Sequence, residues 1–286
     1  MDISQFLIKP EAPLKLKDHK TNFTGGFKSK LEAESKLADN ILRMDDLQAK
    51  LYAQDKYSLL LVFQAMDGGG KDSAIKHVMS GLNPQGTQVF SFKQPSKEEM
   101  DHGFLWRISK ALPEKGRIGI FNRSHYEEVL IVKVHDLVKQ ERLPDWVLND
   151  KIWEMRYRQI NDFERYLYET GTYIVKFFLH ISRDEQKKRF LKRIESPAKN
   201  WKITGEDIAE RQYWNDYQKC YEEAISATST ENAPWYVIPG DRKWFAHLTV
   251  SEVIVQTMTS MDISFPKVKG KQLDELNGLK DKLSKE

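Results

Sequence analysis

The chain has 286 residues, with 45 Lys or Arg against 42 Asp or Glu, so its formal net charge is only +3. This charge argues against a general polyanion-binding protein, and a hydrophobic content of 40% is enough to bury a substantial core. A single cysteine, Cys220, excludes an internal disulfide framework, and no apolar run approaches the ~20 residues of a membrane span. Because its start also lacks the pattern of a signal peptide, we expect a soluble, cytoplasmic protein with no membrane partner.

The two ends of the chain differ in character from its middle. Residues 1–27 mix charges with prolines and glycines and are expected to form an extended arm. Residues 28–54 place apolar side chains at three- and four-residue steps, which predicts a helix and a plausible contact between subunits. Residues 266–286 are highly charged and are expected to be a loose tail. The body, residues 28–265, is predicted to be one domain.

Within the body, apolar runs alternate with helical patterns. The predicted strands, mostly continuous apolar runs typical of strands buried on both faces, are residues 58–64, 88–92, 117–122, 172–182 and 235–239. The further predicted helices are residues 71–82, 96–112, 145–169, 184–195, 206–228 and 244–260. This alternation predicts an α/β fold, a three-layer α/β/α sandwich with a parallel sheet, whose phosphate sites would lie at the carboxyl ends of the strands.

A glycine-rich loop, "QAMDGGGKDS" (residues 64–73), follows the first of these strands. An Asp-Gly pair is also typical of a hairpin, but a hairpin requires a second strand, and a helical pattern follows instead. Free N–H groups at a helix start attract anions, so the context predicts a phosphate site. The usual phosphate loop is G-x-x-x-x-G-K-[ST], whereas Ala65 and Asp72 occupy its first and last positions here.

Two carboxylates in this loop point to a metal ion. A carboxylate facing a triphosphate is repulsive unless a cation lies between them, and carboxylates are ligands of Mg²⁺. The sequence therefore predicts that Asp67 works with one or more Mg²⁺ ions. For Asp72, a metal role and a helix-capping role are equally consistent with the sequence.

A second polar cluster, "IGIFNRSHYEEVLI" (residues 118–131), begins as a buried strand and turns polar at its end. The planar fork of Arg123 is suited to bridging two phosphoryl groups and stabilising the charge on a transferred one. We expect Tyr126 to pack in the core, and His125 is consistent with either packing or chemistry. Glu127 and Glu128 are consistent with a solvated helix face. Alternatively, one of them faces inward and acts as a metal ligand or as the partner of a base.

A basic stretch, "RDEQKKRFLKRIESPAKNWK" (residues 183–202), follows the fourth predicted strand. Its position at a strand end favours a mobile helical lid, about residues 183–205, that closes over a phosphorylated substrate. A solvated helix face and a nucleic-acid patch are the alternatives.

These motifs together resemble the polyphosphate kinase 2 family, and specifically its class III members. The resemblance covers about residues 55–260 and is carried in family order by "QAMDGGGKD", "GLNPQG", "FNRSHYEEVLIVKVH", "HISRDEQKKRF…WK" and "TSTENAPWYVIP". It implies a P-loop-kinase-like fold with a helical lid, and reversible, Mg²⁺-dependent phosphoryl transfer from inorganic polyphosphate to AMP and ADP, giving ADP and ATP. It also favours a homo-oligomer. An ATP-dependent nucleotide or nucleoside kinase and a nonenzymatic nucleic-acid binder are the rival interpretations.

The resemblance also implies roles for individual residues. Asp67 and Lys71 match the first family motif, and Asn122 and Arg123 match the second, where Asn122 with Glu127 marks class III. These residues are expected to be catalytic, with Asp67 and Glu127 holding the metal. The residues expected to bind phosphate or polyphosphate are Gly68, Gly69, Gly70, Lys71, Asp72, Lys76, His77, Lys133, Arg183, Lys187, Lys188 and Arg189. Lys133 stands where relatives often have Arg.

Overall fold

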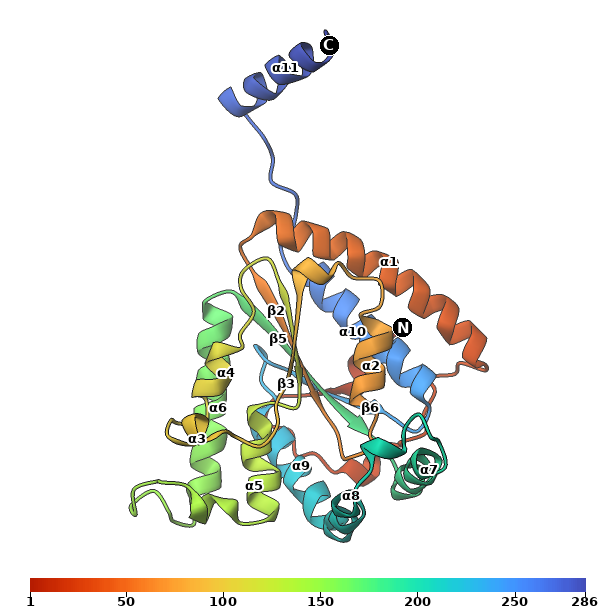
Figure 1. Cartoon of the computed structure of the whole chain (residues 1–286), viewed down its shortest axis with the longest axis vertical. Helices are drawn as coiled ribbons and strands as arrows, with labels where there is room; N and C mark the ends of the chain where they lie inside the picture. Colours follow the sequence, from red (N-terminus) through yellow and green to blue (C-terminus); the bar gives the residue numbers. More distant parts are fainter.

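The computed structural model describes the whole chain, residues 1–286, as a central sheet between helices (Figure 1). The sheet has six strands in the order β1-β6-β5-β2-β4-β3. The strands are β1 (Leu7–Ile8), β2 (Ser58–Gln64), β3 (Thr87–Ser91), β4 (Ile118–Asn122), β5 (Thr172–His180) and β6 (Trp235–Pro239). None of the helices is both long and apolar enough to cross a membrane.

The helices lie on both faces of the sheet and at its ends. They are α1 (Lys30–Gln54), α2 (Lys71–Val78), α3 (Lys97–Met100), α4 (Trp106–Lys110), α5 (Ile131–Val134), α6 (Ile152–Glu169), α7 (Arg183–Ile194), α8 (Gly205–Ala209), α9 (Trp214–Thr228), α10 (Lys243–Ser260) and α11 (Lys271–Leu283). Helices α1, α2 and α10 cover one face, and α4, α6 and α9 cover the other (Figure 1).

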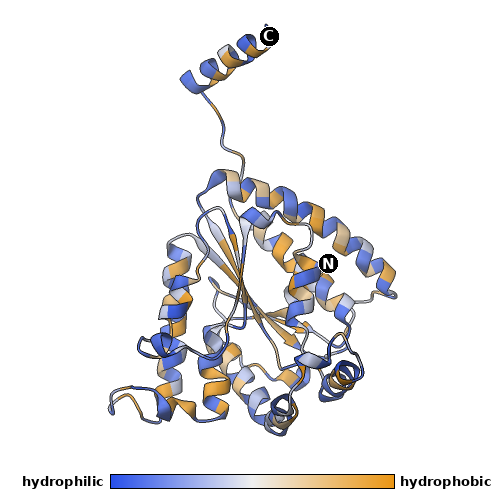
Figure 2. Cartoon of the chain, viewed as in Figure 1, coloured by the Kyte–Doolittle hydropathy of each residue, from blue (hydrophilic) through white to orange (hydrophobic).

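The predicted α/β sandwich is confirmed, and its core is divided by the sheet. Leu59, Leu61 and Phe63 of β2 belong to a cluster of 26 buried residues with α1, α2 and α10. Leu60 and Val62 of the same strand belong to a second cluster of 26 residues with α4, α6 and α9. Successive side chains of a strand point to opposite faces of the sheet, and helices cover both faces. Nearly every residue of such a strand is therefore buried, which explains the continuous apolar runs. Figure 2 shows α1, which has water on its outer side, alternating between hydrophilic and hydrophobic residues.

The prediction of a wholly parallel sheet is wrong at one strand. β1, in the N-terminal arm, pairs antiparallel with β6, with Leu7 opposite Tyr236. The arm is tied to the body because Phe6 and Leu16 are buried and the amide of Leu14 donates to the Ser226 hydroxyl. The short arm therefore forms part of the core. Its two-residue strand had no alternating pattern by which the sequence would reveal it.

Three predicted helices were too long. Residues 96–112 form two helices, because a capping box between Ser96 and Glu99 starts α3 and the chain turns at Gly103 before α4. α6 begins only at Ile152, because the side chain of Asn149 accepts a hydrogen bond from the amide of Lys151 and forms a turn. Residues 206–228 are divided by the 3₁₀ turn Glu210–Tyr213. α2 also ends earlier than predicted, at Val78, and β5 ends at His180, while the remaining ends shift by at most two residues.

The C-terminal tail, which its charge predicted to be loose, contains one helix, α11. Leu273, Leu276, Leu279 and Leu283 recur at three- and four-residue steps, which is a helical period. The helix has no buried residue and stands apart from the rest of the chain at the end of a linker (Figure 1).

Two buried histidines make the stability of this fold depend on pH. Burial lowers the pKa of His180, at the end of β5, and of His247, in α10, from 6.5 to about 4. In the unfolded chain these rings take up protons near pH 6.5, while the folded chain resists protonation until about pH 4. The unfolded state therefore binds more protons between these values, so stability falls as the pH falls through this window.

We expect the free energy of unfolding to drop between pH 7 and pH 4 by up to about 3 kcal/mol per ring. Urea denaturation followed by circular dichroism at several pH values would measure this loss. His180→Phe and His247→Phe should each reduce the loss, and an unchanged pH profile in both variants would contradict the assignment.

Candidate active site

The glycine loop joins β2 to α2 at the carboxyl end of the sheet, where the sequence predicted it. Gly70 directly precedes the first residue of α2. Its φ of +101° is a backbone conformation that residues with a side chain rarely adopt. At Gly69 a Cβ atom would lie 2.4 Å from the Cβ of Ala65 and 2.7 Å from the carbonyl oxygen of Met66. Ala65 itself has no positive φ, so it replaces the usual glycine without strain.

Lys71 begins α2 and extends back over the loop. Its Nζ donates to the carbonyl oxygen of Ala65 at 2.9 Å. Burial and the nearby Arg123 charge lower the pKa of Lys71, while Asp67, Glu127 and Asp72 counteract part of this shift. The Lys71 ammonium is therefore partly desolvated and lies near a second cation, the Arg123 guanidinium. An anion placed between the two would be stabilised.

Arg123 follows β4 in the left-handed backbone region, with φ +64°. Its amide donates to the carbonyl oxygen of Phe63, which fixes the turn against the end of β2. Such a conformation costs a non-glycine residue roughly 1–2 kcal/mol. Strain of this kind persists only where the surroundings determine it, and it is concentrated at functional sites.

The guanidinium of Arg123 lies between two carboxylates. Its Nη2 is 3.0 Å from Asp67 Oδ1, and its Nη1 is 3.9 Å from Glu127 Oε2. Burial opposes the charge, but Glu127 and Asp67 outweigh this effect and raise the pKa of Arg123. The structure thus brings together both predicted motifs, one from each of two neighbouring strands.

Asn122 and Asp72 form a second link between these strands. Asn122 Nδ2 donates to Asp72 Oδ1 at 2.6 Å. Asp72 makes no capping hydrogen bond to the start of α2, so in this structure its carboxylate orients Asn122. Replacing the usual Ser or Thr by Asp therefore has a visible local consequence, namely a fixed amide at the end of β4.

A small cavity of about 60 Å³ opens beside Asp67, Arg123 and Glu127. Its other polar lining residues were not predicted from the sequence: they are Gln186, Glu210, Tyr217 and Tyr221. Tyr217 and Tyr221 are four residues apart on α9, a spacing that places both on one face of the helix. That spacing is the signal in the sequence that was available to find them.

The predicted metal ligands are consistent with magnesium. No group of three or more His, Cys, Asp or Glu side chains is arranged to hold a metal ion. However, Asp67 and Glu127 line the same small cavity. Mg²⁺ is usually bound by only one or two carboxylates together with waters and substrate phosphates, so this pair fits it.

A buried polar network supports the turn at Arg123 from behind. Glu164 of α6 accepts hydrogen bonds from Tyr126 and Lys176 and lies 3.2 Å from His125 Nε2. Burial alone would raise the pKa of Glu164, but the Lys176 charge and the His125 hydrogen bond outweigh it and lower that pKa. Tyr126 therefore packs as expected, and His125, which is 1% exposed, is structural. Glu128 is also structural, since it is buried and pairs with Arg107 and Arg156.

Comparison with known proteins identifies the family. A family model described as Polyphosphate kinase 2 (PPK2) matches residues 28–266. The chain belongs to the polyphosphate kinase 2 family. An ADP-polyphosphate phosphotransferase of Rhodopseudomonas palustris is 51% identical over 261 residues, which is 91% of this chain and 90% of the relative. An AMP/ADP-polyphosphate phosphotransferase of Meiothermus ruber is 42% identical over 92% of this chain and 96% of its own length.

A solved structure agrees with this assignment. Polyphosphate kinase 2 from Arthrobacter aurescens TC1 superposes with a TM-score of 0.87 at 38% identity, over 97% of this chain and 95% of that one. The resemblance seen in the sequence motifs is thereby confirmed, as are the kinase-like fold and the phosphotransferase class of enzyme.

The remaining cations expected in this polyphosphate kinase 2 site are dispersed. Arg183, Lys187 and Lys188 of α7 are exposed, whereas Arg189 is buried with its donors engaged by protein oxygens. Lys133 pairs with Glu223 and with the Tyr157 hydroxyl.

Lys76 and His77, the expected phosphate ligands that follow the first turn of α2, are exposed. Lys76 makes no ion pair, and His77 stacks on His247 with ring centres 4.5 Å apart. The structure therefore brings the loop and the strand-end residues into direct mutual contact, and among the outer cations Arg189 donates hydrogen bonds to the loop backbone.

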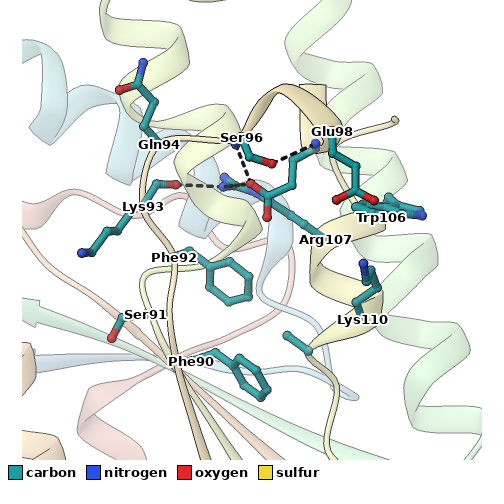
Figure 3. Close-up of a pocket in the computed structure, with 12 residues that line it drawn as sticks. Phe90, Ser91, Phe92, Lys93, Gln94, Ser96, Glu98, Trp106, Arg107 and Lys110 are labelled. Carbon is teal, nitrogen blue, oxygen red and sulfur yellow. Dashed lines mark hydrogen bonds and ion pairs between the residues drawn. The ribbon is translucent and has the colours of Figure 1, made fainter. Parts of the chain in front are cut away.

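A larger pocket, of about 500 Å³, lies beside the carboxyl end of β3 (Figure 3). Phe90 and Phe92 line one side, and Trp106, Arg107 and Lys110 of α4 line another. The sequence contains no local signal for this pocket, because one wall comes from a strand and the other from residues 96–112, whose pattern predicts one long helix.

Proposed function

We propose that this polyphosphate kinase 2 transfers phosphoryl groups from inorganic polyphosphate to AMP and ADP, giving ADP and ATP, as a class III member of the family. The observation that carries the proposal is the position of Arg123 between Asp67 and Glu127, beside a glycine loop that ends in Lys71. The relatives named above act on polyphosphate with ADP or with AMP and ADP. An ATP-dependent kinase would be expected to retain the Ser or Thr that Asp72 replaces.

The charges around the loop support a role for Mg²⁺. Lys71 and Arg123 contribute two positive charges, and Asp67, Asp72 and Glu127 contribute three negative ones. This balance repels a polyanion unless further cations enter with it. Bound Mg²⁺, which Asp67 and Glu127 would hold, supplies charge neutralisation at the phosphate oxygens.

The residues of the chain then have distinct roles. The loop amides and Lys71 bind phosphate oxygens, and the planar fork of Arg123 stabilises charge on the transferred group. Asn122, oriented by Asp72, offers a neutral donor to the acceptor phosphate. An acceptor phosphate oxygen is already ionised near neutral pH, so positioning and charge stabilisation carry the rate.

The proposal includes a homo-oligomer in the cytoplasm. Leu31, Leu42 and Tyr52 of α1 are exposed, and such apolar side chains on one long helix are suited to contact with a second copy.

The activity is tested by supplying the purified chain with AMP, Mg²⁺ and long-chain polyphosphate in the absence of ATP. We expect ADP to appear first and ATP later, as measured by chromatography of the nucleotides. An ordinary ATP-dependent kinase would form neither product under these conditions. A gel shift with nucleic acid and no product would favour the nonenzymatic interpretation.

Lys71→Ala and Arg123→Ala are each expected to reduce kcat/KM about 10²–10³-fold, because each deletes one preorganised charge facing the transferred group. Arg165→Ala is the control, since Arg165 is exposed on α6 and pairs only with Asp162. Steady-state rates with polyphosphate and AMP would measure the effect. Turnover near that of the control in either variant would mean that the site is misplaced.

We further infer that the pocket beside β3 receives the nucleoside of the acceptor. Ser91 is paired with Asn122 in the sheet, and the amide of Phe92 donates to the carbonyl oxygen of Asn122. The pocket therefore begins one strand away from Arg123. A volume of about 500 Å³ with aromatic walls is typical of a pocket for a small organic ligand.

Phe92→Ala and Trp106→Ala are expected to raise the KM for AMP about tenfold while leaving the KM for polyphosphate within about twofold, because stacking on a base contributes ~1–3 kcal/mol. Trp146→Ala, which removes a 76%-exposed tryptophan outside the pocket, is the control. An unchanged KM for AMP in both pocket variants would place the nucleoside elsewhere.

A further inference from the structure

We propose that Gln186 and Arg189 of α7 are positioning residues, which hold the glycine loop in its phosphate-binding form by capturing its backbone carbonyl groups. The sequence had suggested instead that Arg189 touches phosphate. The inference rests on the proposed use of the loop for polyphosphate. It gives a role to the inner face of α7, which has no role in the mechanism described above.

Three successive loop carbonyls point at α7. Gln186 Nε2 donates to the carbonyl oxygen of Asp67 at 2.7 Å. Arg189 Nη1 donates to the carbonyl oxygens of Gly68 at 3.0 Å and Gly69 at 2.9 Å. Gln186 is 2% exposed and Arg189 is 7% exposed, so water does not compete for these bonds.

The geometry of the peptide bond converts these contacts into a direction for the loop amides. In a trans peptide the C=O of one residue and the N–H of the next point in opposite directions. With the carbonyls of Asp67 and Gly69 turned toward α7, the amides of Gly68 and Gly70 must point away from it. Neither amide donates to any group of the protein, so both are available to an anion.

Both positioning side chains are themselves fixed by further contacts. Arg211 Nη1 donates to Gln186 Oε1 at 2.6 Å, which leaves the Gln186 amide nitrogen to face the loop. Arg189 Nε donates to Glu185 Oε1, and Arg189 Nη2 donates to the carbonyl oxygen of Gly240 after β6. All three guanidinium nitrogens of Arg189 are therefore engaged without a phosphate.

Packing adds a steric component to this arrangement. A Cβ atom at Gly68 would lie 2.9 Å from the Phe190 ring, so α7 and the loop are in close contact. The inner face of α7 is thus part of the support of the loop, whereas Lys187 and Lys188 lie on its exposed side. Any lid movement of this region must either leave that inner face in place or release the loop.

The test compares Arg189→Met and Gln186→Leu with Arg117→Met. Arg117 is a matched control, because it also donates to a backbone carbonyl and pairs with a carboxylate, but at the opposite end of β4. For each folded variant, the measurements are the KM for polyphosphate, the KM for AMP, and hydrogen exchange of the amides of residues 67–71. Gln186→Leu keeps its side-chain size and leaves Arg189 in place, so it carries the test if Arg189→Met does not fold.

We expect the KM for polyphosphate to rise at least tenfold in both variants, the KM for AMP to stay within about twofold, and the loop amides to exchange faster than in Arg117→Met. A merely structural role would lower the thermal midpoint without separating the two KM values. A polyphosphate KM within twofold of the control would overturn the inference. A raised polyphosphate KM with unchanged loop exchange would also overturn it, because Arg189 would then be a direct phosphate ligand.

Failure of the proposed function is a separate outcome. If the unaltered chain makes no ADP or ATP from polyphosphate, that function is wrong. The positioning inference would still be tested by loop exchange and by calorimetric titration of each variant with inorganic tripolyphosphate.

Discussion

The guanidinium of Arg123, held between Asp67 and Glu127, is the contact on which the site depends. It joins the end of β4 to the loop after β2, and it requires the left-handed backbone of Arg123 and the hydrogen bond from its amide to Phe63. A cation placed this way is already oriented and partly desolvated before a phosphate arrives. Electrostatic stabilisation of a transition state is strongest when the groups that supply it need no reorganisation.

Two layers of support surround this contact. On one side the buried network of Lys176, Glu164, Tyr126 and His125 fills the space behind the turn with side chains that are hydrogen-bonded to one another. On the other side α7 contacts the carbonyl face of the glycine loop. The first layer fixes where the strand-end side chains begin, and the second fixes which way the loop amides point. Glu164 and Lys176 in the first layer, and α7 in the second, are distant in sequence from the residues that they position.

The charges of the site also explain why the loop departs from the usual phosphate-binding pattern. A hydroxyl at position 72 would offer one weak ligand, whereas Asp72 orients Asn122 and adds a negative charge that a metal ion must offset. An aspartate at the same place would be repulsive in a loop that binds phosphate without a metal. The altered loop is therefore consistent with an enzyme whose two substrates are both polyanions and whose cations arrive with them.

The sequence by itself determined the α/β class, the bounds of β2 and β6, the loop and its helix, and the pair of motifs at the two strand ends. These are local properties, because an unbroken apolar run, a helical period or a glycine beside a helix start can be recognised within a dozen residues. The division of residues 96–112 into α3 and α4, and the antiparallel β1, were decided by turns and pairings that leave a weak local signal. Which cations of α7 are exposed and which are buried was likewise decided by tertiary contacts and not by a local pattern. Lys188 and Arg189 are adjacent in a basic run, yet only the packing of α7 against the loop buries Arg189 among carbonyl oxygens and leaves Lys188 in water. Which of two neighbouring charges faces a site depends on the helix's rotation about its axis, and only its tertiary contacts fix that rotation.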